Sequence, residues 1–357
     1  MIRVLHVSGN EFNLSNGIGR LLSQLVSNQN SFSSVIDSEL LLLYRQEMDL
    51  VDFKFYFYSD FPADLLRNYD LVVFHGIYFF GYCSISKKLR SIGVPYLVKP
   101  HSSLMIQAQR KSFMKKKVAN LLFFNSFLNG SCGVVYTSDG ECVRSYYRSN
   151  KIFIEPNGLD IPHLLNTDRD SERLRFIYLG RLDVNHKGLD VLLESLLILK
   201  SEGHLNKFDF DFYGKGGHAD EQFFKKRLAA LEAPTVNFYG PIYSPDKEIA
   251  LSRSDVFVLT SRYEGVPMAI LEALCQGVPC LVTPGTNIGE SVSELDFGWV
   301  VEFDSYEISR KILAIINSNN DDLEKKRINA RHYVESVHAW PQVVKTSESI
   351  FKSVIGI

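Results

Sequence analysis

The stretch VFVLTSRYEGVPMAILEALCQGVPCLVT, residues 256–283, has the pattern of strand, helix and strand. Two short apolar runs, VFVLT and PCLVT, flank a segment that opens at Pro267 and has the length and composition of a helix. Parallel strands of one sheet need such a crossover between them. The stretch therefore predicts a βαβ unit, with a helix over residues 267–276.

Alternating strands and helices continue on the N-terminal side of this unit. Strands FIYLG, FDFDFYG and VNFYG lead back to Arg175, and a second series comprises strand 2–7, helix 17–26 and strands 71–74 and 96–98. A chain of 357 residues also exceeds the usual size of a single core. The sequence predicts an α/β protein with two doubly wound, Rossmann-like parallel sheets facing across a cleft, in domains 1–165 and 166–340. The hinge is expected near residues 160–170, within the segment EPNGLDIPHLLNTDRDSE, which is rich in Pro, Asn, Gly and Asp.

The overall composition argues against several classes of protein. The chain has 45% apolar residues and a net charge of −2, which gives no reason to expect nucleic acid as a partner. Its five cysteines show no metal-ligand spacing, and a chain of this size needs no disulfides. The longest apolar run, VANLLFFNSFL, is shorter than the ~18 residues of a membrane helix. We expect a cytoplasmic protein that is soluble or peripheral.

One part of the chain departs from the overall charge balance. Residues 71–138 contain no acidic residue but nine basic ones, namely Lys87, Lys88, Arg90, Lys99, Arg110, Lys111, Lys115, Lys116 and Lys117. Within this part, QRKSFMKKKVANLLFF, residues 109–124, has the pattern of an amphipathic helix with lysines beside an apolar face. Such a helix suits an anionic membrane surface, which predicts membrane contact through residues 87–117. The alternative is a core-facing helix with a solvated charged side.

Glu272 is the only charged residue between Glu264 and Glu290. It lies about a turn and a half inside the helix opened by Pro267, where apolar neighbours offer no countercharge. A buried carboxylate without a partner is strongly destabilising. Two explanations remain open: Glu272 pairs with a distant Arg or Lys, or it accepts hydrogen bonds from ligand hydroxyls. The N-terminus of the same helix, residues 265–269, is predicted to bind an anion.

Cations and histidines follow other predicted strands. Arg181 and Lys187 flank the turn after FIYLG, where two cations near a helix N-terminus would hold a diphosphate; otherwise both are ordinary solvated charges. His75 and His101 come just past strands of a parallel sheet, whose carboxyl ends line the ligand crevice, although either could cap its strand or lie in the core. His101 is the stronger candidate because it opens the longest basic stretch.

Two other motifs are weaker. NGIGRLL, residues 16–22, lacks the third glycine of a dinucleotide fingerprint, so nicotinamide binding is not expected. Gly17 and Gly19 would instead let the backbone approach a phosphate. DFD, residues 209–211, has the composition of a metal site, but it alternates with phenylalanines in a strand, and we expect no metal there.

GRLDVNHKGLDVLLESL, residues 180–196, is followed about eighty residues on by SRYEGVPMAILEALCQGVPCLVT, and together they resemble the retaining nucleotide-sugar glycosyltransferases of family 4, which have the GT-B fold. The resemblance extends over nearly the whole chain, through VLHVSG, NGIGR, VPYLVKPHSSL, YTSDGE, PNGLD, FYGKGG and VNFYGPI. It implies that a C-terminal helix, about residues 341–357 after Trp340, crosses back to the first domain.

The resemblance also implies roles for matching positions. Glu264 matches a glutamate that faces the donor sugar, and Glu272 one that faces the ribose hydroxyls of the nucleotide. Arg181 and Lys187 match the pair that holds the donor diphosphate, and His101 matches a histidine beside the reacting sugar. The expected catalytic residues are therefore His101, Glu264, Arg181 and Lys187. Further donor contacts are expected at Gly17, Gly214, Gly265, Val266, Pro267 and Met268, and further acceptor-side contacts at His75 and Ser102.

The resemblance implies transfer of a sugar from a nucleotide-diphosphate sugar to a hydroxyl of a lipid-linked glycan acceptor, with retention at the anomeric carbon. Arg181, Lys187 and the helix N-terminus would stabilise the leaving diphosphate, so neither metal nor cofactor is expected. The implied pathway is the synthesis of cell-surface polysaccharide, such as O-antigen, capsule or exopolysaccharide, at the inner face of the cell membrane.

The sequence departs from the family at two positions. Asn16 precedes Gly17 where the family usually has two adjacent glycines, and Ser102 follows His101 where it usually has glycine. The first departure bears on a phosphate contact at residue 16 and the second on the acceptor pocket. Two other functions stay open: a nucleotide-sugar epimerase of similar architecture, and a non-catalytic nucleotide-binding partner of another transferase.

Overall fold

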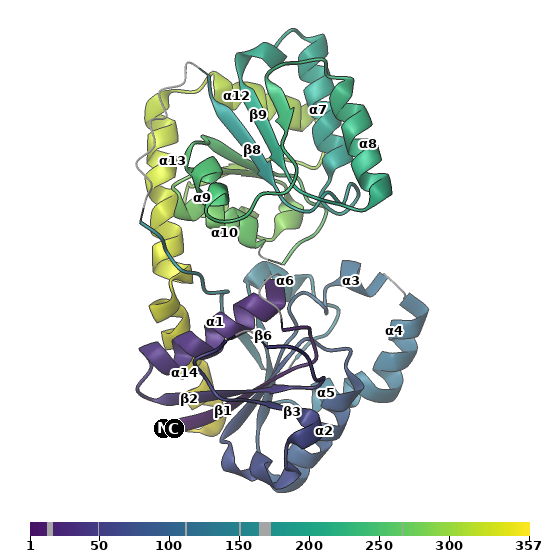
Figure 1. Cartoon of the computed structure of the whole chain (residues 1–357), viewed down its shortest axis with the longest axis vertical. Helices are drawn as coiled ribbons and strands as arrows, with labels where there is room; N and C mark the ends of the chain where they lie inside the picture. Colours follow the sequence, from purple (N-terminus) through teal and green to yellow (C-terminus); the bar gives the residue numbers. More distant parts are fainter. Residues whose placement is uncertain (13–16, 49, 111–112, 150, 164–172, 266) are drawn as a thin grey trace. The chain divides into compact units, whose positions relative to one another are not determined.

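The computed structural model describes residues 1–12, 17–48, 50–110, 113–149, 151–163, 173–265 and 267–357. The chain divides into two compact units, Met1–Asp160 with Val337–Ile357, and Ile161–Ser336. Each unit has one parallel β-sheet with helices packed against it (Figure 1). The first boundary lies five residues before the expected one at residue 165, and the chain returns to the first unit at Val337.

The first unit contains a seven-stranded sheet in the order β3-β2-β1-β4-β5-β6-β7, with every neighbouring pair parallel. Its strands are β1 (Ile2–Ser8), β2 (Ile36–Leu42), β3 (Phe55–Phe57), β4 (Leu71–His75), β5 (Tyr96–Lys99), β6 (Gly133–Tyr136) and β7 (Ile152–Ile154). Its helices are α1 (Gly17–Phe32), α2 (Phe80–Ile92), α3 (Ile106–Arg110), α4 (Phe113–Ala119), α5 (Asn125–Asn129), α6 (Asp139–Val143) and α14 (Trp340–Ile355). Strands β4, β5 and β6 are buried along their whole length, as expected when helices cover both faces.

The C-terminal helix α14 completes the core of the first unit. Trp340 and Val343 pack in one cluster with side chains of α1 and β2, and Ile350 and Phe351 pack in another with side chains of β1 and β4. These apolar positions fall on one face of α14, which explains why the helix folds with residues far earlier in the chain rather than with its sequence neighbours.

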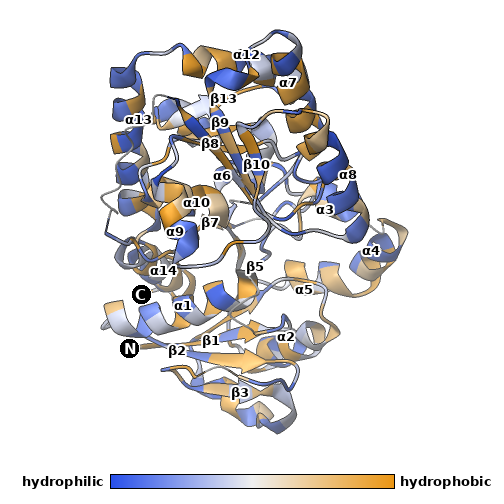
Figure 2. Ribbon diagram, turned by 45° about the horizontal axis from the view of Figure 1, so that its top comes forward, coloured by the Kyte–Doolittle hydropathy of each residue, from blue (hydrophilic) through white to orange (hydrophobic). Residues whose placement is uncertain are grey.

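The second unit contains a six-stranded parallel sheet in the order β10-β9-β8-β11-β12-β13. Its strands are β8 (Arg175–Leu179), β9 (Asp209–Tyr213), β10 (Val236–Phe238), β11 (Val256–Leu259), β12 (Cys280–Val282) and β13 (Gly298–Val300). Its helices are α7 (Leu189–Ser201), α8 (His218–Ala229), α9 (Asp246–Ser252), α10 (Met268–Cys275), α11 (Gly289–Glu294), α12 (Ser305–Ile316) and α13 (Asn320–Tyr333). In Figure 2 the strands of this sheet are mainly orange, whereas α8 and much of α13 are blue.

The prediction of two doubly wound parallel sheets is confirmed. In the segment 109–124, where a helix is expected, the structure describes the end of α3 at Arg110, α4 over Phe113–Ala119 and a π-helix over Asn120–Phe124, while residues 111–112 lie outside the described residues. Of the helices in the described part of the chain, none combines the length and apolarity needed to span a membrane.

Candidate functional site

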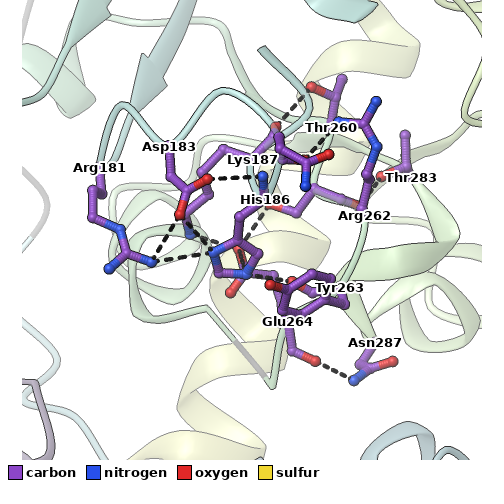
Figure 3. Close-up of polar contacts among 12 residues, drawn as sticks. Arg181, Asp183, His186, Lys187, Thr260, Arg262, Tyr263, Glu264, Thr283 and Asn287 are labelled. Atoms are coloured by element: carbon purple, nitrogen blue, oxygen red, sulfur yellow. Dashed lines mark hydrogen bonds and ion pairs between the residues drawn. The ribbon is translucent and has the colours of Figure 1, made fainter. Parts of the chain in front are cut away.

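The order of strands in the second sheet brings two distant loops together. The sheet reverses its order between β8 and β11, which are neighbours although about eighty residues separate them. Ligands of such sheets bind outside the carboxyl ends of the strands at this switch point. The loop after β8 carries Arg181 and Lys187, and the loop after β11 carries Glu264. Figure 3 shows that these side chains gather at the same place.

Lys187 and Glu264 form an ion pair there. Lys187 Nζ lies 2.5 Å from Glu264 Oε1, and the Ser261 hydroxyl donates to the same oxygen at 2.7 Å. The charged side chains are only 13% and 10% exposed, so solvent screens their attraction weakly. Removing either partner would leave the other as a largely buried, uncompensated charge.

His186 connects Arg181 to this pair (Figure 3). Its ring stacks on Tyr263 with centroids 4.2 Å apart, and its Nε2 atom donates to the Tyr263 carbonyl at 2.7 Å. Its Nδ1 atom lies 3.2 Å from Arg181 Nη2 and therefore accepts, since a guanidinium only donates. The ring is thus neutral, in agreement with burial, which lowers the pKa of His186. The Arg181 side chain also lies 3.5 Å from Asp183 and is 63% exposed, so it is the solvent-facing cation of the site.

Two close contacts fix the loops on each other. Gly188, which precedes α7, has φ of +65°, and a Cβ atom there would lie 2.1 Å from the carbonyl oxygen of Thr260. Only glycine meets both conditions. From the other loop, Arg262 donates to both carboxylate oxygens of Asp190, at 2.9 and 2.7 Å, and covers the ring of Phe303. These contacts hold the loop after β11 against the first turn of α7.

Glu272 is not an isolated carboxylate. It lies in α10, where its Oε1 atom is 2.8 Å from Nζ of Lys247 in α9, and the two side chains are 25% and 13% exposed. The expectation of surroundings without a countercharge is therefore wrong, and the first of the two explanations, a distant lysine, describes the structure. Its Oε2 atom has no hydrogen-bond partner among the residues that the structure describes, which leaves an acceptor for a ligand.

Helix α10 begins at Met268, one residue later than expected, and Pro267 is its N-cap without a side-chain hydrogen bond. The first amides of a helix have no partner inside the helix, so this end can donate to an anion. Gly265 precedes this end in the same loop as Glu264. Val266 lies outside the described residues.

Two other predicted donor contacts lie elsewhere in the fold. Gly214 follows β9, and a Cβ atom on it would lie 2.0 Å from the carbonyl oxygen of Gly180. Packing of the loops after β8 and β9 therefore requires glycine there whether or not a ligand binds. Gly17 is the first residue of α1 in the first unit, and its neighbour Asn16 lies outside the described residues.

The acidic pair of β9 has arginine neighbours. Asp209 lies 3.5 Å from Arg173 and Asp211 lies 3.7 Å from Arg175. Both aspartates line a pocket of about 500 Å³ that no predicted donor residue lines. Within the described ranges, no three His, Cys, Asp or Glu side chains are grouped so that they could hold a metal ion.

In the first unit, His75 and His101 lie in one row with His6. His6 Nδ1 is 2.9 Å from His75 Nε2, and His75 Nδ1 is 2.9 Å from His101 Nε2. His75 is 1% exposed, which leaves its side chain almost no surface for direct contact with an acceptor. His101 is partly exposed and is the member of the row that a substrate could reach.

His101 and Ser102 have an unusual backbone, with φ of +47° and +66°. L-residues rarely adopt positive φ, and such strain often accompanies functional sites. The Ser102 N–H donates to Oε1 of the buried Glu141 at 2.5 Å, which holds the turn in place. This conformation explains why a glycine would suit position 102.

Several residues of these sites were not among those predicted. His186 lies between Arg181 and Lys187 in one short motif, and this position could have marked it as a candidate. Ser261 and Lys247 give no local signal, because their importance depends on which side chain they meet. His6 lies inside an apolar strand, where it is hard to distinguish from an ordinary core residue.

Comparison with known proteins shows what the second unit is similar to. Residues 166–333 match the family model of glycosyl transferases group 1. The GDP-mannose:cellobiosyl-diphosphopolyprenol alpha-mannosyltransferase of Xanthomonas oryzae is 23% identical over 300 residues, which are 82% of this chain and 77% of that protein. The putative colanic acid biosynthesis glycosyltransferase WcaL of Escherichia coli is 29% identical over 178 residues, which are 45% of this chain and 41% of that protein.

The fold of the whole chain is similar to that of HepE from Anabaena, solved in complex with UDP and glucose. The TM-score is 0.70 with 14% identity, and the match covers 100% of both chains. At this identity the similarity shows the fold alone. Over residues 166–333 the chain is therefore similar to the glycosyl transferases group 1, and the whole chain has a GT-B fold of two parallel-sheet domains.

Proposed function

We propose that this glycosyltransferase moves a sugar from a nucleotide-diphosphate sugar to a hydroxyl of a glycan acceptor, with retention at the anomeric carbon. The observation that carries the proposal is the meeting of Arg181, Lys187 and Glu264 at the switch point of the second sheet. Two cations and a carboxylate at this place suit a ligand that has both a diphosphate and sugar hydroxyls.

The second unit would hold the donor. Negative charge builds up on the diphosphate as the glycosidic bond breaks, and Arg181, Lys187 and the N-terminus of α10 would stabilise it without a metal ion. Glu264, held by Lys187 and Ser261, would support the donor sugar. The Oε2 atom of Glu272 would accept a hydrogen bond from a ribose hydroxyl.

The first unit would hold the acceptor beside His101. The mannosyltransferase relative is named for a GDP-mannose donor and a diphosphopolyprenol acceptor, and the other relative for colanic acid biosynthesis. These names support a lipid-linked acceptor and a role in cell-surface polysaccharide synthesis for this chain as well.

A lipid-linked acceptor implies work at a membrane, and the surface around α4 supports this. Six apolar side chains of α4 and the following π-helix are 44% to 76% exposed, namely Phe113, Met114, Val118, Leu121, Leu122 and Phe123. Lys115 and Lys117 of α4 are exposed among them. Exposed apolar groups beside lysines match a bilayer with anionic headgroups, and no acidic residue between 71 and 138 opposes that contact. We therefore propose that the protein acts peripherally at the inner face of the membrane.

Calorimetric titration with UDP, GDP and ADP in EDTA tests the donor site. The wild type is expected to bind one of the three nucleotides, and Glu272→Ala to bind it at least tenfold more weakly. Glu194→Ala, which also removes the acidic partner of a basic side chain in the second unit, is the control and should bind normally. If no nucleotide binds without a metal, or if Glu272→Ala binds as tightly as the wild type, the donor assignment fails.

Product analysis tests the reaction itself. NMR of the anomeric proton in the transferred sugar should show the same configuration as in the donor. Inversion would contradict the proposed stereochemistry, and an epimerised nucleotide sugar without transfer would favour the epimerase alternative. Intact nucleotide binding without turnover would favour a non-catalytic partner.

Vesicle sedimentation tests the membrane contact. Binding is expected to vesicles containing phosphatidylglycerol but not to pure phosphatidylcholine vesicles. The double substitution Leu121→Ser/Leu122→Ser should weaken binding at least tenfold, about 1.4 kcal/mol. Ile328→Ser, which removes an apolar side chain that is 68% exposed in the second unit, is the matched control. Equal binding by both variants would refute this surface.

A further inference from the structure

A continuous row of hydrogen bonds runs through the core of the first unit from Glu155 to His101. Its six members come from distant parts of the sequence and are, in order, Glu155, Ser347, Gln29, His6, His75 and His101. Ser347 Oγ is 2.6 Å from Glu155 Oε1, Gln29 Nε2 is 3.1 Å from Ser347 Oγ, and Gln29 Oε1 is 2.8 Å from His6 Nε2. The two links between the histidines are each 2.9 Å.

Glu155 sets the direction of the row. Its carboxylate is buried, pairs with Lys99 at 3.2 Å, and can only accept hydrogen bonds. Ser347 therefore donates to Glu155 and accepts from the amide nitrogen of Gln29. This orientation turns the amide oxygen of Gln29 toward His6, and the Ser38 hydroxyl also donates to that oxygen at 2.6 Å.

The same order of donor and acceptor continues from one imidazole to the next. Because Gln29 Oε1 accepts, His6 carries its proton on Nε2, and its Nδ1 accepts from His75 Nε2. His75 Nδ1 in turn accepts from His101 Nε2. The Nδ1 atom of His101 is left with an unshared lone pair, and no residue in the described part of the chain bonds to it.

The surroundings keep this row neutral. Burial is the leading cause that lowers the pKa of His6 to about 4 and of His101 to about 3, and it also holds the pKa of His75 well below its usual range. The charge of Lys99 acts in the same direction on all three rings. A second proton on His6 or His75 would also remove the acceptor that the next ring needs.

We propose that His6 and His75 are positioning residues, which hold His101 as the Nε2–H tautomer so that its Nδ1 atom accepts a hydrogen bond from a substrate hydroxyl. His101 is then an acceptor that orients a sugar hydroxyl and not a proton donor to the leaving group. The role toward substrate rests on the function proposed above, whereas the tautomer does not.

NMR of protein with ¹⁵N-labelled histidine tests the row without any substrate. Long-range ¹H–¹⁵N correlations at pH 6 to 8 should show that His6, His75 and His101 are all protonated on Nε2 alone. His338 supplies an internal reference, because its Nδ1 atom faces the Asn157 carbonyl at 2.7 Å and must carry a proton. An Nδ1–H tautomer or a cationic ring at His101 in this pH range would overturn the proposal.

Two substitutions of His75 separate positioning from simple packing. Gln can both donate to His6 and accept from His101, whereas Leu has a similar size and can do neither. The assay measures the nucleotide released from GDP-mannose or UDP-glucose, whichever the wild type turns over. The kcat of His75→Leu should be at least tenfold lower than that of His75→Gln. Nucleotide affinity should be equal in the two variants, and the Nε2–H signal of His101 should persist only in His75→Gln.

The outcomes distinguish the proposal from the function on which it depends. A leucine variant as active as the glutamine variant would show that the row acts only in packing. If the wild type turns over neither nucleotide sugar, the proposed function is in question, but the tautomer measurement still decides whether the row has the stated direction.

Discussion

At the residue scale, Lys187 and Glu264 form a short, largely buried ion pair in the proposed donor site. Because both side chains are largely buried, Lys187→Met or Glu264→Gln should each lower the free energy of unfolding by about 3 kcal/mol. The double variant should lose at least about 1 kcal/mol less than the sum of the single losses, since neither charge is left alone. Urea unfolding of all four proteins measures this coupling.

The exposed pair of Lys200 and Glu232 provides the comparison. Their side chains are 36% and 79% exposed, so the same cycle there should give a coupling of less than about 1 kcal/mol. Similar couplings at both pairs would mean that burial of Lys187 and Glu264 adds nothing to their attraction.

Ser102 offers a second test on a single residue. Its φ of +66° is strained for serine, so Ser102→Gly should stabilise the first unit by about 0.5–1 kcal/mol after the greater chain entropy of glycine is counted. Ser103, which is not among the residues with positive φ, is the control, and Ser103→Gly should destabilise by a similar amount. Thermal unfolding of the two variants measures the difference, and a loss of stability in Ser102→Gly would argue against strain.

How far the sequence predicts single residues depends on where their partners lie. Arg181, Lys187 and Glu264 lie in short motifs beside predicted strand ends, so strand order alone brings them together. The partner of Glu272 is 25 residues away on another helix, and no local pattern marks Lys247 for that role. For the same reason the sequence could mark His75 and His101 as candidates but could not show that His75 is buried and His101 is partly exposed.

At the element scale, two glycines at opposite ends of α7 separate backbone strain from steric clash. Gly188 and Gly203 both have positive φ, +65° and +75°, but a Cβ atom would meet the Thr260 carbonyl at 2.1 Å only at Gly188 and nothing within 4 Å at Gly203. Gly203→Ala should therefore lower the free energy of unfolding by about 1 kcal/mol, and Gly188→Ala by at least about 2 kcal/mol more. Urea unfolding measures the loss of unfolding free energy in each variant. Equal losses would show that the loop after β11 moves aside to make room for the added Cβ atom.

Helices and strands were predictable where their pattern was strong and their residues were mainly apolar. The apolar runs of β8 and β11 and the helix between β11 and β12 were identified within one or two residues. Strand β2 was missed because its sequence, IDSELLL, places Glu39 in a buried position. That carboxylate accepts from the Tyr69 hydroxyl and approaches Arg3 at 3.7 Å, contacts that only the folded chain provides. Strand β13, with the sequence GWV, was not predicted either.

At the scale of the whole molecule, the buried neutral histidines predict a stability that depends on pH differently in the two units. His6, His75, His101 and His338 of the first unit all have pKa values lowered by burial, whereas His186 is the histidine with a lowered pKa among the described residues of the second. Below pH ~6.5 the unfolded chain binds protons that the folded unit does not, so stability is complete above that pH and falls toward pH ~4. Between pH 6.5 and 5.5, where most carboxylates stay ionised, each such histidine should remove about 1 kcal/mol.

The chain has two tryptophans, one in each unit, so fluorescence can follow the units separately. In Trp299→Phe the remaining Trp340 reports on the first unit, and its urea midpoint should fall steeply from pH 6.5 to 5.5. In Trp340→Phe the remaining Trp299 reports on the second unit, and its midpoint should fall far less, since one histidine of lowered pKa acts there instead of four. If the two units unfold in separate transitions, equal slopes in the two variants would mean that the histidine row takes up protons in the folded state.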